Sequence, residues 1–162
     1  MDDIFVFAGA YETLVDAKVD FSALEDLHAD KWISAFQAAV FEKRGDGKIK
    51  VVNTTSTTRT AGAKWGGILG IALGMLFPAS ILITTIEGAV VGAAAGNVAK
   101  GWTHWDVEAI SKTLEPGSAG VIVIAYARPE LGPEHVLKRA GTRTKAKLDQ
   151  NSIEVREALE ES

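Results

Sequence analysis

The first half of the chain changes its hydrophobic period in a way that predicts a strand, a helix and two further strands. A continuous apolar run from Ile4 to Tyr11 is rich in aromatic and branched side chains and indicates a buried strand. From about Tyr11 to His28, apolar residues recur at helical spacing, which predicts a helix with a break near residues 20–22. Its apolar positions are Leu14, Val15, Ala17, Phe21, Leu24 and Leu27, and the acidic positions expected to face solvent are Asp16, Asp20, Glu25 and Asp26.

The helix is followed by a predicted hairpin. Residues 32–43 have a strand-like pattern and lead into the turn Arg44-Gly45-Asp46-Gly47. Glycine supplies the positive φ that many tight turns need, so this turn predicts a returning strand over residues 48–54.

The second half of the chain contains one further strong strand signal. Thr103 is a candidate N-cap for a helix that carries Val107, Ile110 and Leu114 on one face and ends at residues 115–118. Residues 120–127 are the most apolar strand candidate and are expected to lie centrally in a sheet. A turn at residues 129–133, a short helix at 135–140, an edge strand or coil at 142–148 and a helix at 153–159 follow.

The order strand, helix, strand, strand, helix, strand predicts an α+β fold. It is the order of the ferredoxin-like, or split βαβ, arrangement, in which helices pack on an antiparallel sheet. The predicted ferredoxin-like domain is discontinuous and comprises residues 1–60 and 102–148. Residues 61–101 are then an inserted glycine-rich helical hairpin, and residues 149–162 a C-terminal helical tail.

The inserted stretch contains two rows of glycines. The rows are Gly62, Gly66, Gly70 and Gly74 before Pro78, and Gly88, Gly92 and Gly96 after it. On a helix a step of four residues keeps each glycine nearly above the last, so each row forms a groove that another backbone can approach closely. We therefore expect two glycine-zipper helices, joined at residues 77–80, that pack helix against helix and make the protein a homo-oligomer.

The same stretch has features of a hairpin that enters a membrane from the cytoplasm. Candidate interface anchors at its base are Lys64, Trp65, Lys100, Trp102 and Trp105. The first arm, residues 65–77, is very apolar but shorter than the ~20 residues of a spanning helix, and the second, residues 79–99, is only weakly hydrophobic. We favour the hypothesis that the hairpin contacts lipid. The alternative is a soluble oligomer, a closed shell or ring, in which the hairpins pack together and the tryptophans are ordinary core residues.

Glu87 is the one charge between Lys64 and Lys100. As a functional carboxyl it would titrate, bind a cation or line a pore. The alternative is a structural carboxyl that accepts hydrogen bonds from Ser80, Thr84 or Thr85 of a neighbour.

Composition and charge exclude several classes of function. The chain has 17 Lys and Arg against 21 Asp and Glu, which argues against nucleic-acid binding, and it has no cysteine for disulfide or thiolate chemistry. The N-terminus is acidic where a secretory signal would be basic, so we expect a cytoplasmic domain at the inner membrane, or a protein of the cytoplasm.

No catalytic or cofactor motif is recognisable. The histidines His28, His104 and His135 share no metal-ligand spacing, and the glycine-rich runs lack the context of a nucleotide-binding loop. We therefore expect no catalytic residues, no metal, no cofactor and no small-molecule substrate. A locally basic segment is either a solvated face or a contact for anionic lipid headgroups, and it consists of Lys138, Arg139, Arg143, Lys145 and Lys147.

The chain resembles a bacterial family of unknown function whose members are often labelled predicted membrane proteins. The resemblance lies in the turn Gly45 to Lys48, the glycine-rich stretch Gly62 to Gly96 and the Leu114 to Ser118 element. It covers the chain to about Leu148 and implies no catalytic residues. Together with the hairpin, it suggests a non-enzymatic, self-assembling protein associated with a membrane. A soluble closed homo-oligomer is the alternative, and a pore or ion pathway is a third possibility.

Overall fold

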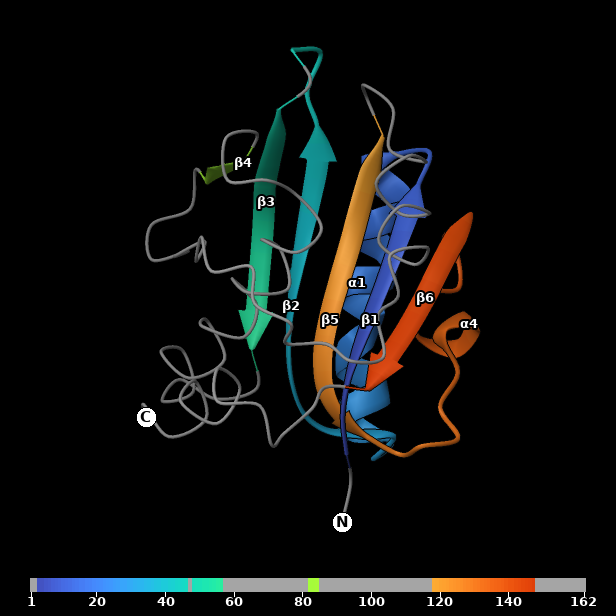
Figure 1. Cartoon of the computed structure of the whole chain (residues 1–162). Helices are drawn as coiled ribbons and strands as arrows, with labels where there is room; N and C mark the ends of the chain where they lie inside the picture. The colour runs from blue at the N-terminus through green and yellow to red at the C-terminus, as the bar shows by residue number, and fades with distance from the viewer. Residues whose placement is uncertain (1–2, 47, 57–81, 85–117, 148–162) are drawn as a thin grey trace.

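The computed structural model describes residues 3–46, 48–56, 82–84 and 118–147 (Figure 1). They form a six-stranded sheet with the strand order β4-β3-β2-β5-β1-β6. Neighbouring strands are antiparallel except β3 and β4, which are parallel. The strands are β1 (Asp3–Tyr11), β2 (Ile33–Lys43), β3 (Ile49–Ser56), β4 (Leu82–Thr84), β5 (Ala119–Ala127) and β6 (Thr142–Lys147), and the helices are α1 (Leu14–Ala29) and α4 (Pro133–Val136). The α+β class is confirmed.

Strand β5 lies in the middle of the sheet, as its sequence predicts. It pairs with β1 from Asp3↔Ala127 to Tyr11↔Ala119 and with β2 on its other side. Its side chains are buried on both faces apart from the partly exposed Tyr126, which explains why its sequence is an unbroken apolar run.

The ferredoxin-like strand order is wrong for this chain. Strands β1 and β2 run parallel with α1 between them in sequence, so the first half is a split βαβ unit. In a ferredoxin-like sheet the third strand would occupy the gap, and the last would lie at an edge. Here β5 occupies the gap and β3 lies outside β2. The physical reason is burial, because β5 is apolar throughout, whereas β3 carries Lys50 and the exposed Asn53.

Helix α1 is continuous and begins later than its sequence pattern indicated. Tyr11 belongs to β1, and Thr13 caps the helix by accepting a hydrogen bond of 3.2 Å from the Asp16 amide. The expected break near residue 20 is absent from this helix. Two side-chain predictions were also wrong: Asp20 is buried, and Val15 is 71% exposed.

The C-terminal end of α1 is a Schellman motif built on a lysine. The Trp32 amide donates to the Leu27 carbonyl at 3.0 Å, and the Lys31 amide donates to the His28 carbonyl at 3.1 Å. Lys31 occupies the left-handed position with φ 63°. Glycine is the usual residue there, since a Cβ is strained at positive φ.

The β2–β3 turn and the segment after β5 also differ in detail from expectation. In the turn between β2 and β3, Asp46 accepts a hydrogen bond of 3.0 Å from the Lys48 amide, and Gly45 does not adopt a positive φ. The predicted helix at 135–140 is displaced to Pro133–Val136, because proline favours the first helical turn. The segment from residue 142 is an edge strand, β6, paired with β1.

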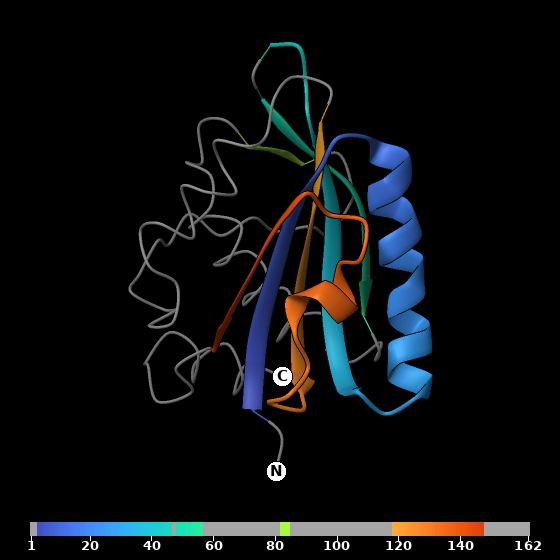
Figure 2. The same ribbon diagram turned by 90° about the vertical axis from the view of Figure 1, so that its right-hand side faces the viewer.

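Both helices lie on one face of the sheet (Figure 2). We call this the helix face; its core includes Phe7, Phe36, Val123 and Leu24. The opposite face, which we call the second face, is also apolar, and none of its buried apolar residues is more than 2% exposed. Its buried apolar residues are Ile4, Val6, Ala8, Ala10, Ala39, Phe41, Ile49, Val51, Ile122 and Ile124.

Part of the predicted helical hairpin, residues 61–101, is extended. Leu82–Thr84 form β4, which pairs with β3 from Ile49↔Leu82 to Val51↔Thr84. The prediction of a helix from residue 79 is therefore wrong at these positions, where the run Ile81 to Thr85 is rich in branched side chains that favour strands. The rest of the hairpin lies outside the described residues, as do the helices predicted after Thr103 and at the C-terminus.

Replacing Lys31 with glycine is expected to stabilise the protein by about 1 kcal/mol, since it relieves the strain of a left-handed side chain at the end of α1. Urea unfolding measures the change. Lys31→Ala keeps the Cβ and serves as the control, with a change within about 0.5 kcal/mol. Equal stabilities for the glycine and alanine variants would contradict this account.

Candidate functional site

The second face of the sheet is the candidate functional site, because it is a large apolar surface that neither described helix covers. Four strands contribute to it through alternate residues. The residues that point to this face in β2 and β5 follow from the register, which pairs Ala39 with Ile122 and Gln37 with Ile124. Their sequence neighbours, such as Ala38 and Val123, belong to the helix face.

The second face contains a close aromatic contact near the start of β5. A Cβ built on Gly120 of β5 would lie 2.3 Å from the ring of Phe41 on the adjacent strand. The ring therefore occupies the space that a side chain at residue 120 would take. This packing requires glycine at residue 120.

Gln37 is the polar exception on this face. Its side chain is only 9% exposed, and its Oε1 atom has no hydrogen-bond partner. A buried acceptor without a donor costs free energy, on the order of 1–3 kcal/mol. The unpaired Gln37 oxygen therefore disfavours burial of the second face at this position.

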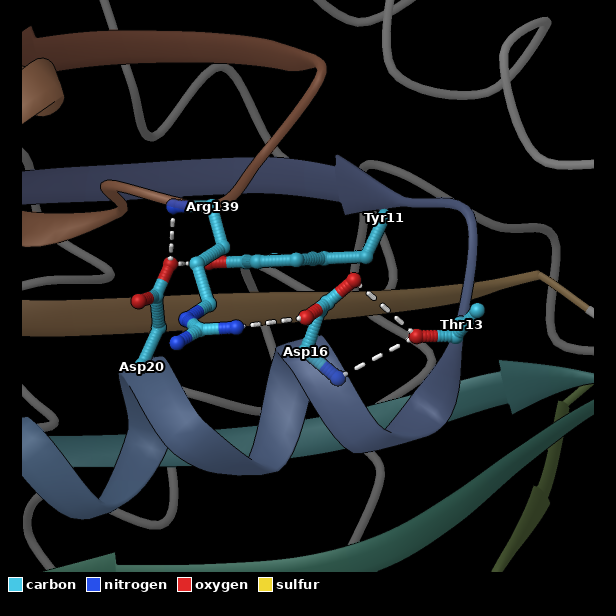
Figure 3. A network of polar contacts seen from close by, with 5 residues as sticks. All are labelled: Tyr11, Thr13, Asp16, Asp20 and Arg139. Carbon is cyan, nitrogen blue, oxygen red and sulfur yellow. Dashed lines mark hydrogen bonds and ion pairs between the residues drawn. The ribbon is translucent and has the colours of Figure 1, made fainter.

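A polar cluster with a buried centre, Tyr11 and Asp20, lies on the other side of the sheet (Figure 3). The Tyr11 hydroxyl donates to Asp20 Oδ2 at 2.7 Å, and the Arg139 amide donates to the same oxygen at 2.8 Å. The Arg139 guanidinium donates to Asp16 Oδ1 at 2.9 Å, and the Thr13 hydroxyl donates to Asp16 Oδ2 at 3.2 Å. The cluster joins the end of β1, the first turns of α1 and the segment after α4.

The role of this cluster is structural. Burial raises the pKa of the Tyr11 phenol, and its hydrogen bond to the Asp20 carboxylate raises that pKa further. The phenol therefore keeps its proton and remains a hydrogen-bond donor at neutral pH. Tyr11 fixes the first strand to the helix, and Asp20 is held by donors from two distant segments.

Lys145 fixes the turn after β5 to the edge strand β6. Its ammonium group donates to the carbonyl oxygens of Pro129 and Leu131, both at 2.8 Å, and lies 4.2 Å from the Phe5 ring centroid. Burial lowers the pKa of Lys145, while Glu134 and Glu130 act in the opposite direction. This lysine is thus committed to contacts within the protein.

The other members of the basic segment also contact the protein itself. Arg139 pairs with Asp16, the Arg143 guanidinium donates to the Leu137 carbonyl at 3.3 Å, and Lys147 lies 3.1 Å from Asp3. Contact with anionic lipid headgroups stays an untested prediction, and it would compete with these internal contacts.

The described histidines have different partners. His28 Nδ1 lies 3.1 Å from the Ile33 carbonyl oxygen, and His135 lies 3.3 Å from Glu134. His104 is outside the described residues. In the described part of the chain, no group of three or more potential metal ligands is found.

A pocket of about 320 Å³ opens near the end of α1. Leucines form its apolar part, charges of both signs surround it, and the exposed Trp32 ring lies 5.1 Å from the Arg128 guanidinium carbon. Its residues are Leu27, Asp30, Trp32, Glu130, Leu131, His135 and Lys138.

The site residues predicted from the glycine-rich stretch lie outside the described ranges. This holds for the glycine rows (Gly62, Gly66, Gly70, Gly74, Gly88, Gly92 and Gly96), for Glu87, and for the anchors Lys64, Trp65, Lys100, Trp102 and Trp105. Among residues 3–46, 48–56, 82–84 and 118–147, no helix has the length and apolarity needed to cross a bilayer.

Comparison with known proteins places the chain in a family. The model of a family described as "Protein of unknown function (DUF1269)" matches residues 63–161. The chain belongs to this family. The match includes the glycine-rich stretch from residue 63 on, β5 and β6, whereas β1, α1, β2 and β3 precede it. No curated protein and no solved structure matches the chain in the corresponding searches.

Sequence reasoning missed Asp20 and Gln37, although each left a signal. Asp20 lies three residues after Ala17 and four before Leu24, on the buried side of α1. Gln37 interrupts the apolar run of β2, where both of its sequence neighbours, Phe36 and Ala38, are buried. A polar residue at a position that the hydrophobic period assigns to the core is the signal common to both.

Replacing Tyr11 with phenylalanine is expected to destabilise the protein by about 1–3 kcal/mol at neutral pH, because Asp20 loses a buried donor. Urea unfolding measures the loss, and a double-mutant cycle with Asp20→Asn isolates the pair. Tyr11→Phe with wild-type stability would contradict this role.

The pH dependence follows from the raised Tyr11 pKa. An unfolded tyrosine releases its proton near pH ~10, whereas folded Tyr11 retains it, so the stability from this group is complete below that pH and is lost above it. The stability difference between the wild type and Tyr11→Phe should therefore shrink above pH ~10, by up to ~1.4 kcal/mol per pH unit.

Proposed function

We propose that this chain is a non-enzymatic, self-assembling protein whose sheet domain carries the glycine-rich segment, residues 61–101, and that this segment joins copies of the chain at a lipid bilayer. The composition of the glycine-rich segment carries the proposal, since Glu87 is its one charge between Lys64 and Lys100. An apolar segment of this length needs protein or lipid against it, because soluble monomers rarely expose apolar patches larger than a few hundred Å².

The position of the glycine-rich segment supports this proposal. The segment belongs to the connection between β3, which ends at Ser56, and β5, which begins at Ala119. The domain thus presents the segment from two of its own strands. In the proposed assembly the glycine rows pack against helices of neighbouring copies, and the second helical arm begins after β4.

The proposed place of the assembly is the cytoplasmic side of the inner membrane. Lys64 and Lys100, together with Trp65, Trp102 and Trp105, suit one membrane interface at the base of the hairpin. The sheet domain would then lie in the cytoplasm, and the Glu87 carboxyl would face neighbouring copies rather than lipid tails.

A second candidate is a soluble homo-oligomer that forms a closed shell or ring. The second face favours it, because an apolar sheet offers protein cover for a segment composed mostly of small apolar residues. In this case the glycine rows would have the same packing role without contact to lipid.

Fractionation after expression without detergent, followed by mass measurement of each pool, separates the candidates. We expect most of the wild type in the membrane fraction as an oligomer. A large, lipid-free, monodisperse soluble particle would contradict the bilayer contact and support the closed assembly. A soluble monomer would contradict both.

Gly70→Leu and Gly92→Leu are expected to reduce the size of the assembly, since each side chain fills a groove meant for another backbone. Ala72→Leu and Ala94→Leu add similar bulk two residues away, off the glycine rows, and should reduce it less. Mass measurement in native buffer or mild detergent gives the result. An unchanged assembly for both glycine variants would show that the rows do not join copies.

A further inference from the structure

We propose that the pocket near the end of α1 binds a small zwitterion with an ammonium group, an anionic group and an apolar part, the chemistry of an α-amino acid with an apolar side chain. This inference goes beyond the proposed function and depends neither on assembly nor on lipid. It stands on the size of the pocket, on the origin of its charged groups and on a tryptophan ring that is already held in place.

The pocket lies where three connections of the fold meet. Its residues come from the last turn of α1 and the α1–β2 connection, from the turn after β5, and from α4 with the residues directly after it. Helices α1 and α4 contact each other on the helix face of the sheet (Figure 2). Residues far apart in the sequence thus form one site.

The size of the pocket suits a small molecule. Its volume of about 320 Å³ lies at the small end of the range for ligand pockets, about 300–1,000 Å³. At ~30 Å³ for each water of the liquid, this space takes about ten water-sized groups. A free amino acid has this size, whereas a folded partner would need a larger surface.

The charged groups of the pocket differ in sign between its segments. Asp30 in the α1–β2 connection and Glu130 in the turn after β5 carry carboxylates. Lys138 and His135 instead come from α4 and the residues directly after it. A ligand with a single charge would be attracted by one segment and repelled by another. A ligand with charges of both signs is attracted by all three.

The pocket offers charges that the protein does not use itself. Within the described ranges, the side chains of Asp30, Glu130 and Lys138 take part in no ion pair and no side-chain hydrogen bond. Lys138 differs in this respect from the rest of its basic segment, in which Arg139, Arg143, Lys145 and Lys147 all contact other parts of the protein. Hydrogen bonds to charged groups are roughly twice as strong as neutral ones, so a ligand that pairs with these groups is held firmly.

The aromatic wall of the pocket is fixed before a ligand binds. The Trp32 amide donates to the Leu27 carbonyl at 3.0 Å, and the Trp32 carbonyl accepts from the Arg128 amide at 3.3 Å. The Arg128 guanidinium carbon lies 5.1 Å from the ring centroid, and Arg128 is not a pocket residue, so it supports the ring from outside the pocket. The ring is nevertheless 39% exposed. A large ring held in this way offers apolar contact at little cost in entropy.

The turn after β5 is also held in place. The Lys145 ammonium group donates to the Pro129 and Leu131 carbonyls on either side of Glu130, both at 2.8 Å. Both Glu130 and Leu131 line the pocket. This wall therefore has a defined position, and preorganised walls strengthen binding because less freedom is lost.

The strained residue Lys31 gives independent support. It adopts a left-handed conformation with φ 63°, and both of its sequence neighbours, Asp30 and Trp32, line the pocket. Strain of this kind is concentrated at ligand sites, where it holds side chains in a required position. Here the left-handed turn brings a carboxylate and an aromatic ring to the same cavity.

These observations assign one place to each part of the ligand. The ammonium group lies near the carboxylates of Asp30 and Glu130, and the anionic group lies near the Lys138 ammonium group. The apolar part packs on the Trp32 ring and on the leucines of the pocket.

Ligand-observed NMR titration of the full chain with phenylalanine tests the site, and we expect saturable binding. Phenylpropionate lacks the ammonium group, and phenethylamine lacks the carboxylate. Each is expected to bind about tenfold more weakly, the scale of one lost charge-assisted contact. Equal affinity for all three compounds would reduce the site to an apolar surface and overturn the proposal, and so would the absence of saturable phenylalanine binding.

Matched variants assign the two charges. Lys138→Gln is expected to weaken phenylalanine binding about tenfold without weakening the binding of phenethylamine, which has no carboxylate. Asp30→Asn should weaken phenylalanine binding to a similar extent without weakening the binding of phenylpropionate. Both residues are exposed, so the variants keep the fold.

Lys18→Gln and Asp26→Asn, at exposed positions of α1 outside the pocket, are the controls and should leave all affinities unchanged. If Lys138→Gln and Asp30→Asn gave the same affinities as these controls, the assigned contacts would be wrong and the proposal would fail.

Phosphoethanolamine carries both charges without an apolar part and therefore tests whether the ligand is a lipid headgroup. We expect it to bind at least about tenfold more weakly than phenylalanine. Equal or tighter binding would assign the pocket to a headgroup and overturn the amino-acid assignment. The titrations involve no membrane and no measurement of assembly size, so their outcome is distinguishable from the failure of the proposed function.

Discussion

The fold depends on burying one strand, β5, on both of its faces. Four consecutive branched apolar residues, Val121 to Ile124, form its centre and are all 0% exposed. Burying each such side chain contributes about 1.5–3 kcal/mol, so the middle of the sheet must be covered on two sides. This requirement gives β5 its position between β1 and β2 and moves the more polar β3 outward.

The two faces of the sheet differ in what packs on them. On the helix face, α1 packs an apolar stripe on the sheet, and the Tyr11–Asp20–Arg139 contacts fasten it to β1 and to the segment after α4. On the second face, the described residues provide apolar side chains and one amide oxygen, Gln37 Oε1, without a hydrogen-bond partner. The position of α1 is thus fixed by hydrogen bonds between side chains and backbone from distant segments.

Local patterns predicted the elements well and their arrangement less well. The run 120–127 and the turn at 44–47 were sufficient to place β5 and the β2–β3 hairpin, because each depends on nearby residues. The strand order depends on which strand occupies the centre of the sheet, and no local pattern describes that competition. The run 120–127 was expected at the centre, whereas a ferredoxin-like sheet has its last strand at an edge, so these two predictions were inconsistent with each other. Asp20 was assigned to solvent because its partners, Tyr11 and Arg139, come from other parts of the chain. Residues of the glycine rows remain predictions, since they lie outside the described ranges.

The edges of the sheet have a consequence for how copies can meet. Edge strand β6 alternates basic residues at Arg143, Lys145 and Lys147, and these side chains are held by contacts with the protein itself. At the other edge, β4 offers only three residues for pairing. Charged or very short edge strands discourage a second sheet from adding to the first. Growth by continuous strand pairing, the geometry of fibres, is therefore disfavoured at β6 and along the short strand β4.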